Sequence, residues 1–225
     1  VPAYNEGPRL GKVLDLLASL PWLAKVVVVN DGSLDDTGQV ARRYPVLLLE
    51  HTQNLGKGAA LQTGLAHLRE TDAVLFLDAD LVGLKEEHLV ALLEPLRQRP
   101  QPGMVVGTFR RGRWHVDLQQ RWFTVLNGQR ALARHFLDRL PDLSWSRYGV
   151  EVLLSTFAAH QAIPVAEAWL DGLTHVLKEE KFGPVRGFCL RLQMYREVLH
   201  AARVCRRLFP AHTATATAGG READA

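Results

Sequence analysis

The sequence predicts an α/β fold in which a mostly parallel sheet is flanked by helices and is followed by a helical C-terminal part. In the first half of the chain, short β-branched runs alternate with segments whose apolar residues recur at helical spacing. Strands and helices that alternate in this way form parallel sheets covered on both faces. The second half carries longer helical patterns, over 118–140, 148–160 and 184–208.

The individual elements follow from local patterns. Leu10, Val13, Leu14 and Leu17 recur at helical spacing and are followed by Pro21, which predicts a helix and its end. Continuous apolar runs such as Val26 to Val29 are typical of strands buried on both faces. By the same reasoning, the predicted strands cover 26–29, 46–49, 74–77, 104–106 and 163–168.

Length and composition favour one globular domain. The chain has 225 residues, of which 47% are hydrophobic and 23% charged, which are ordinary values for a folded protein. We expect the domain to consist of two halves, 1–110 and 111–210. The segment 211–225 is rich in Ala, Thr and Gly and lacks large apolar residues, so we expect a disordered tail.

Charge and cysteine content exclude several classes of function. A formal charge of +3 is too balanced to indicate nucleic-acid binding. Cys189 and Cys205 stand alone, so neither a disulfide scaffold nor a zinc site is expected. No apolar run approaches the ~20 residues of a membrane span and no signal peptide is visible, so we expect a cytoplasmic protein.

Polar clusters follow three predicted strands, where open parallel sheets bind their ligands. The clusters are Tyr4-Asn5-Glu6, Asn30-Asp31-Gly32-Ser33 and Asp78-Ala79-Asp80. Asp78 and Asp80 point the same way in an extended segment and can share one Mg²⁺ or Mn²⁺ ion. Such a cation would neutralise the charge that develops on a departing nucleoside diphosphate. A solvated turn is the alternative, and the other two clusters weigh against it.

Two further residues suit a nucleotide. Asp31 can accept from the N–H and O–H groups of a base or ribose, although Asp-Gly also favours a turn, and both can hold. Lys57 lies in Asn54-Leu55-Gly56-Lys57-Gly58, just before a predicted helix, where a phosphate is favoured. The order of its glycines matches neither a P-loop nor a Rossmann motif.

Over residues 1–110 the chain resembles family 2 glycosyltransferases, which have the GT-A fold. The resemblance is carried by Val1-Pro2-Ala3-Tyr4-Asn5-Glu6, Val29-Asn30-Asp31-Gly32-Ser33, Asn54-Leu55-Gly56-Lys57-Gly58 and Leu77-Asp78-Ala79-Asp80. Within the family it is similar to polyprenyl- or dolichyl-phosphate sugar synthases and to glucosyl-3-phosphoglycerate-type synthases. The resemblance implies a metal-dependent hexosyltransferase that uses a UDP- or GDP-sugar, with 1–110 binding the donor and 111–210 the acceptor.

The resemblance also implies roles for single residues. Pro2, Ala3, Tyr4 and Glu6 would line the nucleoside site, Asp31 would bind the base, Lys57 would lie by the nucleotide, and Asp78 and Asp80 would hold the metal and diphosphate. Because Asp80 would hold the metal at the leaving diphosphate, the resemblance implies that Asp80 is a catalytic residue. His175 stands where many GT-A enzymes place a third metal ligand, and an ordinary structural histidine is the alternative.

The likeness is thinner beyond residue 110. Asn127-Gly128-Gln129-Arg130-Ala131-Leu132 resembles a segment of the polyprenyl-phosphate enzymes, which implies that Arg130 contacts the acceptor. Glu151 is either a catalytic residue at the acceptor site or a partner of a helix dipole. The Glu-Asp pair that often supplies a general base is missing, and an anionic phosphate acceptor would need none. Arg110, with Arg111 and Arg113, would meet such an acceptor or form a solvated loop.

Other interpretations stay open. A non-catalytic module that only binds nucleotide sugars is one, and a nucleotidyltransferase is another, although residues 1–12 lack the Gly-rich loop that it needs. The helix over 184–208 combines many arginines with Phe188, Leu190, Leu192, Leu199 and Leu208. It is either docked with a solvated basic face or in peripheral contact with an anionic membrane.

Overall fold

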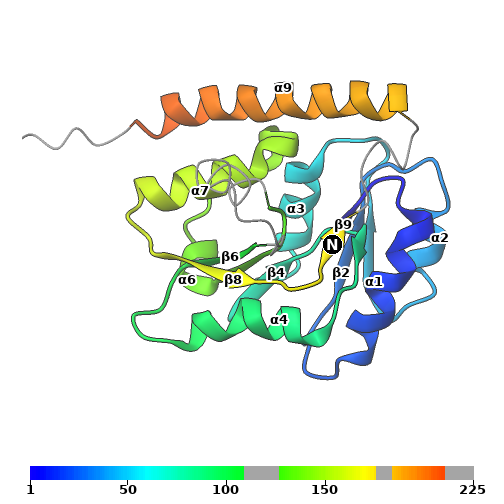
Figure 1. The fold of residues 1–225 in the computed structure, drawn as a ribbon, viewed down its shortest axis with the longest axis horizontal. Coiled ribbons are helices and arrows are strands. Elements are labelled where there is room, and N and C mark those ends of the chain that lie inside the picture. Colours follow the sequence, from blue (N-terminus) through cyan, green and yellow to red (C-terminus); the bar gives the residue numbers. More distant parts are fainter. Residues whose placement is uncertain (109–126, 176–183, 211–225) are drawn as a thin grey trace, which may run out of the picture.

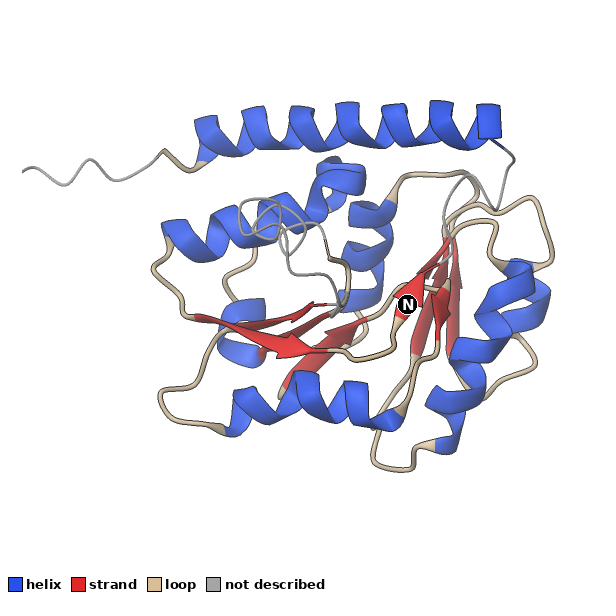
Figure 2. Ribbon diagram, viewed as in Figure 1, coloured by secondary structure: helices blue, strands red, loops and turns tan. Residues whose placement is uncertain are grey.

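The computed structural model describes residues 1–108, 127–175 and 184–210. Arg110, Arg111 and Arg113 and the expected tail over 211–225 lie outside these residues. Within the described parts the chain is an α/β structure with helices on both faces of its sheets (Figures 1 and 2). The predicted α/β class with a helical C-terminal part is therefore confirmed.

The strands form three groups. The first sheet is parallel, with the order β1 (Pro2–Ala3), β2 (Val27–Asn30), β3 (Leu47–Glu50). The second is mixed, with the order β4 (Ala73–Phe76), β7 (Arg130–Ala133), β6 (Met104–Thr108), β8 (Val165–Trp169). The short strands β5 (Leu81–Val82) and β9 (Thr174–His175) pair antiparallel.

The helices fall into layers around these sheets (Figure 1). Their bounds are α1 (Gly7–Ser19), α2 (Thr37–Ala41), α3 (Lys57–Leu65), α4 (Glu86–Leu93), α6 (Arg134–Leu137), α7 (Val150–His160) and α9 (Pro184–Leu208), with 3-10 turns η1 (Glu94–Arg97) and η2 (Ser144–Gly149). The apolar core is divided between them. One cluster joins α1 and α4 to the strands, a second joins α7 and the inner side of α9 to β6 and β7, and a third joins β2 to α3.

The predicted helix over 118–140 is wrong for the part that is described. Arg130–Ala133 is strand β7, antiparallel to both β4 and β6, and only Arg134–Leu137 is helical. The sequence Arg-Ala-Leu-Ala has helical propensity, but both edges of this segment find strand partners and all four residues are buried. Tertiary pairing therefore overrides the local preference.

Strand register brings two of the three polar clusters, those after β1 and β2, to one edge. Ala3 is aligned with Asn30, and Asn30 with Glu50, so β1, β2 and β3 end at the same level. The residues that follow these strands, among them Tyr4 and Asp31, therefore leave the sheet together. This is the edge at which parallel sheets place their ligands.

Candidate active site

The loops after β1 and β2 are locked to each other by backbone-to-side-chain hydrogen bonds. The Asn5 amide donates to Ser33 Oγ at 2.9 Å, and the Glu6 amide donates to Thr37 Oγ1 at 2.8 Å. Asn5 adopts a positive φ of 55°, which short polar side chains tolerate. These contacts fix the predicted nucleoside-site residues Tyr4 and Glu6 beside the loop that carries Asp31.

Asp31 is the anchor of the glycine-containing loop. Its side chain is buried, and its two carboxylate oxygens accept from the amides of Leu55 at 2.9 Å and Gly56 at 2.7 Å. His51 Nδ1 lies 2.7 Å from the same carboxylate. Gly56 has a φ of 99°, which only glycine adopts without strain. Asp31 thus shapes the loop that presents Lys57, and its contact with a base stays a prediction.

Lys57 joins two carboxylates from distant parts of the chain. Its Nζ lies 2.5 Å from Asp78 Oδ1, just beyond β4, and 2.7 Å from Glu151 Oε1, in the first turn of α7. Burial alone would lower the pKa of Lys57, but the attraction of the two carboxylates outweighs it and the pKa lies above its ordinary value. Lys57 is therefore a permanent cation between Asp78 and Glu151.

The second oxygen of Asp78 is held by the segment that precedes β7. Gln129 Nε2 donates to Asp78 Oδ2 at 2.8 Å. Gln129 is 1% exposed, and its own Oε1 has no hydrogen-bond partner among the residues that the structure describes. A buried acceptor without a partner is uncommon and marks a place where a ligand group can donate. The side chain of Asp78 itself remains 28% exposed, so this carboxylate is open to a ligand.

Arg130 adds a second cation beneath these carboxylates. Its guanidinium is fully buried and donates to the Asn127 carbonyl at 3.1 Å and to Ser155 Oγ at 3.1 Å. Burial lowers the pKa of Arg130 to about 10, against the opposite effect of Glu151 and Asp78, so it stays charged at neutral pH. The structure thus gives Arg130 a place inside the protein near both carboxylates, and its contact with an acceptor stays a prediction.

The remaining metal candidates lie close together along the backbone. Asp80 precedes β5, and the pairing of β5 with β9 sets Leu81 opposite His175. His175 therefore enters the neighbourhood of Asp80 through its backbone. Among the side chains that the structure describes, no group of three or more His, Cys, Asp or Glu residues forms a ready metal cage. The metal roles of Asp78, Asp80 and His175 stay predictions.

The sequence did not predict that Arg147 holds the loop over residues 54–58, which carries Gly56 and Lys57. Arg147 Nη1 donates to the Leu55 carbonyl and Nη2 to Asn54 Oδ1, both at 3.1 Å, while Nε donates to Glu197 of α9 at 3.1 Å. Arg147 has a φ of 46°, an uncommon backbone state for a residue with a side chain. No local signal marks Arg147 or Glu197. His51, in contrast, comes shortly after a predicted strand, so its position near the site could have been predicted from the rule that ligands bind where strands end.

Gly128 allows a sharp test of this arrangement. A Cβ at this position would lie 2.4 Å from Asp78 Oδ2 and 2.5 Å from Lys57 Nζ. Both atoms end flexible side chains, so we expect Gly128→Ala to fold but to displace Asp78 and Lys57. Binding of a nucleotide sugar should weaken by about 10-fold or more, because a misplacement of about 1 Å is costly in a site. Thermal shift with donor present measures this.

The matched control for this variant is Gly64→Ala in α3. There the added methyl group would meet only the side chains of Val29 and Val27, at 3.4 and 3.9 Å. Gly64→Ala should keep wild-type donor binding and unfold at the same temperature or higher, since alanine favours a helix. Equal donor binding by Gly128→Ala and Gly64→Ala would contradict the placement of the site at Asp78.

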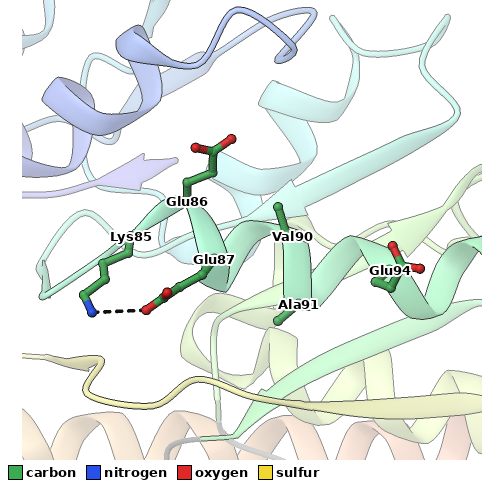
Figure 3. Close-up of a pocket in the computed structure, with 6 residues that line it drawn as sticks. All are labelled: Lys85, Glu86, Glu87, Val90, Ala91 and Glu94. Carbon is green, nitrogen blue, oxygen red and sulfur yellow. Dashed lines mark hydrogen bonds and ion pairs between the residues drawn. The ribbon is translucent and has the colours of Figure 1, made fainter.

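A hollow of about 700 Å³ lies elsewhere, on the surface of α4 (Figure 3). Its polar groups are already engaged with protein: Lys85 pairs with Glu87 at 3.1 Å, and Trp22 Nε1 donates to Glu86 at 2.7 Å. The hollow is lined by Lys85, Glu86, Glu87, Val90, Ala91 and Glu94. It therefore includes none of the residues that the strand edge brings together.

The fold, with polar residues gathered where its strands end, is that of an α/β enzyme domain. Residues 1–147 match the family model described as glycosyl transferase family 2. The chain belongs to this family. A dolichyl-phosphate beta-glucosyltransferase from Trichomonas vaginalis is 45% identical over 96 residues, which cover 36% of this chain and 29% of that protein. The 4,4'-diaponeurosporenoate glycosyltransferase of Staphylococcus aureus is 29% identical over 110 residues, covering 47% of this chain and 29% of that one.

Solved structures support the fold over a longer stretch. Glucosyl-3-phosphoglycerate synthase from Mycobacterium tuberculosis, in complex with Mn²⁺, UDP and glucosyl-3-phosphoglycerate, superimposes with a TM-score of 0.73 at 23% identity. The match covers 91% of this chain and 77% of that one. The GT-A fold class is therefore confirmed. The chain matches less than a third of the length of these curated relatives.

Proposed function

We propose that this protein is a metal-assisted glycosyltransferase that moves a hexose from a nucleotide-diphosphate donor to a phosphate-bearing acceptor. The observation that carries the proposal is the cluster of Lys57, Asp78 and Glu151 at the strand edge, tied through Gly56 to the buried carboxylate of Asp31. An exposed carboxylate and a buried cation meet there, which supports the proposal, because transfer of a sugar from a diphosphate needs fixed charges beside the leaving group.

The oxygen atoms of Asp78, Asp80 and Gln129 are ligands that suit a hard divalent cation. Asp78 and Asp80 offer carboxylate oxygens after β4, and the unpaired oxygen of Gln129 lies on the side chain that already contacts Asp78. Mg²⁺ and Mn²⁺ favour such oxygen ligands, and a diphosphate completes the coordination. When bound, the ion would supply Lewis-acid stabilisation of the leaving nucleoside diphosphate. The presence of Mn²⁺ or Mg²⁺ in complexes of the mycobacterial synthase supports this choice.

The protein's own groups would act by position and charge. Lys57 holds Asp78 and Glu151 at fixed places, so neither carboxylate has to reorganise when the donor binds. In the proposed complex the diphosphate lies beside Lys57, and the sugar lies between Asp80 and Glu151. A phosphate acceptor is an anion already, so transfer to it needs no general base.

Comparison with relatives supports the choice of donor and acceptor. The names of the relatives include a dolichyl-phosphate acceptor, and the mycobacterial synthase has been crystallised with UDP-glucose and phosphoglyceric acid. We therefore propose a UDP-sugar as the first donor to test and a GDP-sugar as the second. Cys189 and Cys205 are both free; a cytoplasmic location is part of the proposal.

A donor screen tests the proposed function. UDP- and GDP-sugars with Mn²⁺ should raise the melting temperature, because a ligand at about 100 times its Kd stabilises the folded state by about 2.7 kcal/mol. The same mixtures should slowly release nucleoside diphosphate. Binding without any release, even with phosphorylated acceptors, would identify a non-catalytic nucleotide-sugar module instead. No shift with any nucleotide sugar would refute the proposal.

A further inference from the structure

We propose that the outer face of α9 docks on an anionic lipid surface. This inference is independent of the proposed function, because it concerns the helix and not the strand-edge site. The sequence left open whether the basic helix over 184–208 is simply docked on the domain or also contacts a membrane. The structure separates the residues that pack inward from those that remain outside, and that separation carries the argument.

The inner side of α9 is made of small residues. Ala201 and Cys205 are fully buried, and α9 packs on α7 and η2 as the outermost layer of the molecule (Figure 1). Gly149 of η2 approaches so closely that a Cβ there would lie 2.1 Å from the Ala201 side chain. At these positions the helix docks through small side chains, and several of its largest apolar residues stay exposed.

Four large apolar residues of α9 instead form an exposed stripe. Phe188, Leu192, Tyr195 and Leu199 are spaced by four, three and four residues, which places them on one face of the helix. Each is between 45% and 55% exposed. We call this set the outer stripe. A row of half-exposed aromatic and leucine side chains along one helix is costly in water and marks an interaction surface.

Arginines flank the outer stripe. Among the side chains of α9 that the structure describes, the exposed arginines are Arg196, Arg203, Arg206 and Arg207. Arg191 lies over the Phe188 ring, 5.8 Å from its centroid. The single acidic residue of the helix, Glu197, is bound to Arg147 on the inner side. The outer face thus joins an apolar stripe to arginines that lie beside it and beyond its C-terminal end.

This chemistry fits one kind of partner. Aromatic and leucine side chains enter the boundary between lipid headgroups and acyl chains, while arginines reach anionic headgroups from beside them. A second copy of the chain fits less well, because two outer stripes related by a two-fold axis would bring their arginines together. No described helix is long and apolar enough to cross a bilayer, so the contact would be peripheral.

Vesicle co-sedimentation tests the proposal with the full chain. The protein should pellet with vesicles of phosphatidylcholine and phosphatidylglycerol, and much less with phosphatidylcholine alone or at high salt. Leu192→Gln with Leu199→Gln should reduce binding by about 10-fold or more, because the two leucines provide apolar contact. Val90→Gln, which changes an exposed apolar residue of α4, should bind vesicles like the wild type.

A second readout needs no substitution. Cys189 on α9 is exposed and Cys205 is buried, so an environment-sensitive fluorophore will label Cys189 selectively. Its emission should shift to the blue when anionic vesicles are added. No pelleting and no shift would overturn the proposal. So would vesicle binding that is equal in the leucine variant, or a dimer in light scattering that the leucine variant abolishes without any vesicle binding.

Discussion

Asp78→Asn is expected to reduce sugar transfer by on the order of 100- to 1,000-fold while the protein still folds. The substitution keeps the size of the side chain and its hydrogen bond with Gln129 can be rebuilt, but one oxygen and the negative charge are lost. Of the two carboxylates joined through Lys57, Asp78 is the more exposed, at 28% against 8% for Glu151, so it is the one that a bound cation can reach. Release of nucleoside diphosphate from the preferred donor measures the effect.

The strand itself offers the control for this experiment. Asp72 is exposed at the other end of β4, so Asp72→Asn makes the same chemical change away from the strand edge. It should retain wild-type turnover. Full activity of Asp78→Asn, with Asp72→Asn as the reference, would show that this carboxylate takes no part in transfer.

Lys57→Met is expected to destabilise the fold as well as to abolish donor binding. Without the cation, Glu151 is left with 8% side-chain exposure and no positive charge at 2.7 Å. Breaking a buried pair by removing one partner typically costs about 3–5 kcal/mol. Urea unfolding should show this loss of free energy, whereas Lys12→Met, at an exposed lysine of α1, should leave stability within about 0.5 kcal/mol of wild type.

A second substitution tests the cause of that loss. Lys57→Met with Glu151→Gln removes the charge that was left unpaired, and much of the stability should return while donor binding does not. Because the pKa of Lys57 is raised in the folded state, its contribution is complete below its unfolded value of 10.5. The difference between wild type and Lys57→Met should therefore be constant from neutral pH up to that value. A loss below about 1 kcal/mol would mean that the pair behaves like a surface ion pair.

Much of the strand-edge site could be predicted because its signals are local. Asp31 and Asp78 each follow an apolar run that is typical of a strand, and α/β sheets bind their ligands where strands end. The structure places the two strands in different sheets, and Lys57 connects their ends. The glycines on both sides of Lys57 predict that a phosphate binds beside it, and this contact stays a prediction. The structure adds how these residues meet: Asp31 holds the loop, and the loop aims Lys57 at Asp78.

The parts that escaped prediction depend on contacts between distant residues. Strand β7 has a sequence that suits a helix, and only its two strand partners decide otherwise. Arg147 and Glu197 meet across 50 positions of sequence, and neither belongs to a motif. The sequence also did not show which face of α9 packs on the domain. Small residues such as Ala201, which are buried, give a weaker apolar signal than the leucines that stay exposed.

The dependence of UDP affinity on a divalent cation tests the central claim most directly. Calorimetric titration of the wild-type protein with UDP in Mn²⁺, and again in a chelator, compares the two affinities without any need to know the acceptor. We predict at least about 10-fold tighter binding with the ion, which corresponds to about 1.4 kcal/mol. Equal affinity in both titrations would contradict a site in which Asp78 grips the diphosphate through a cation.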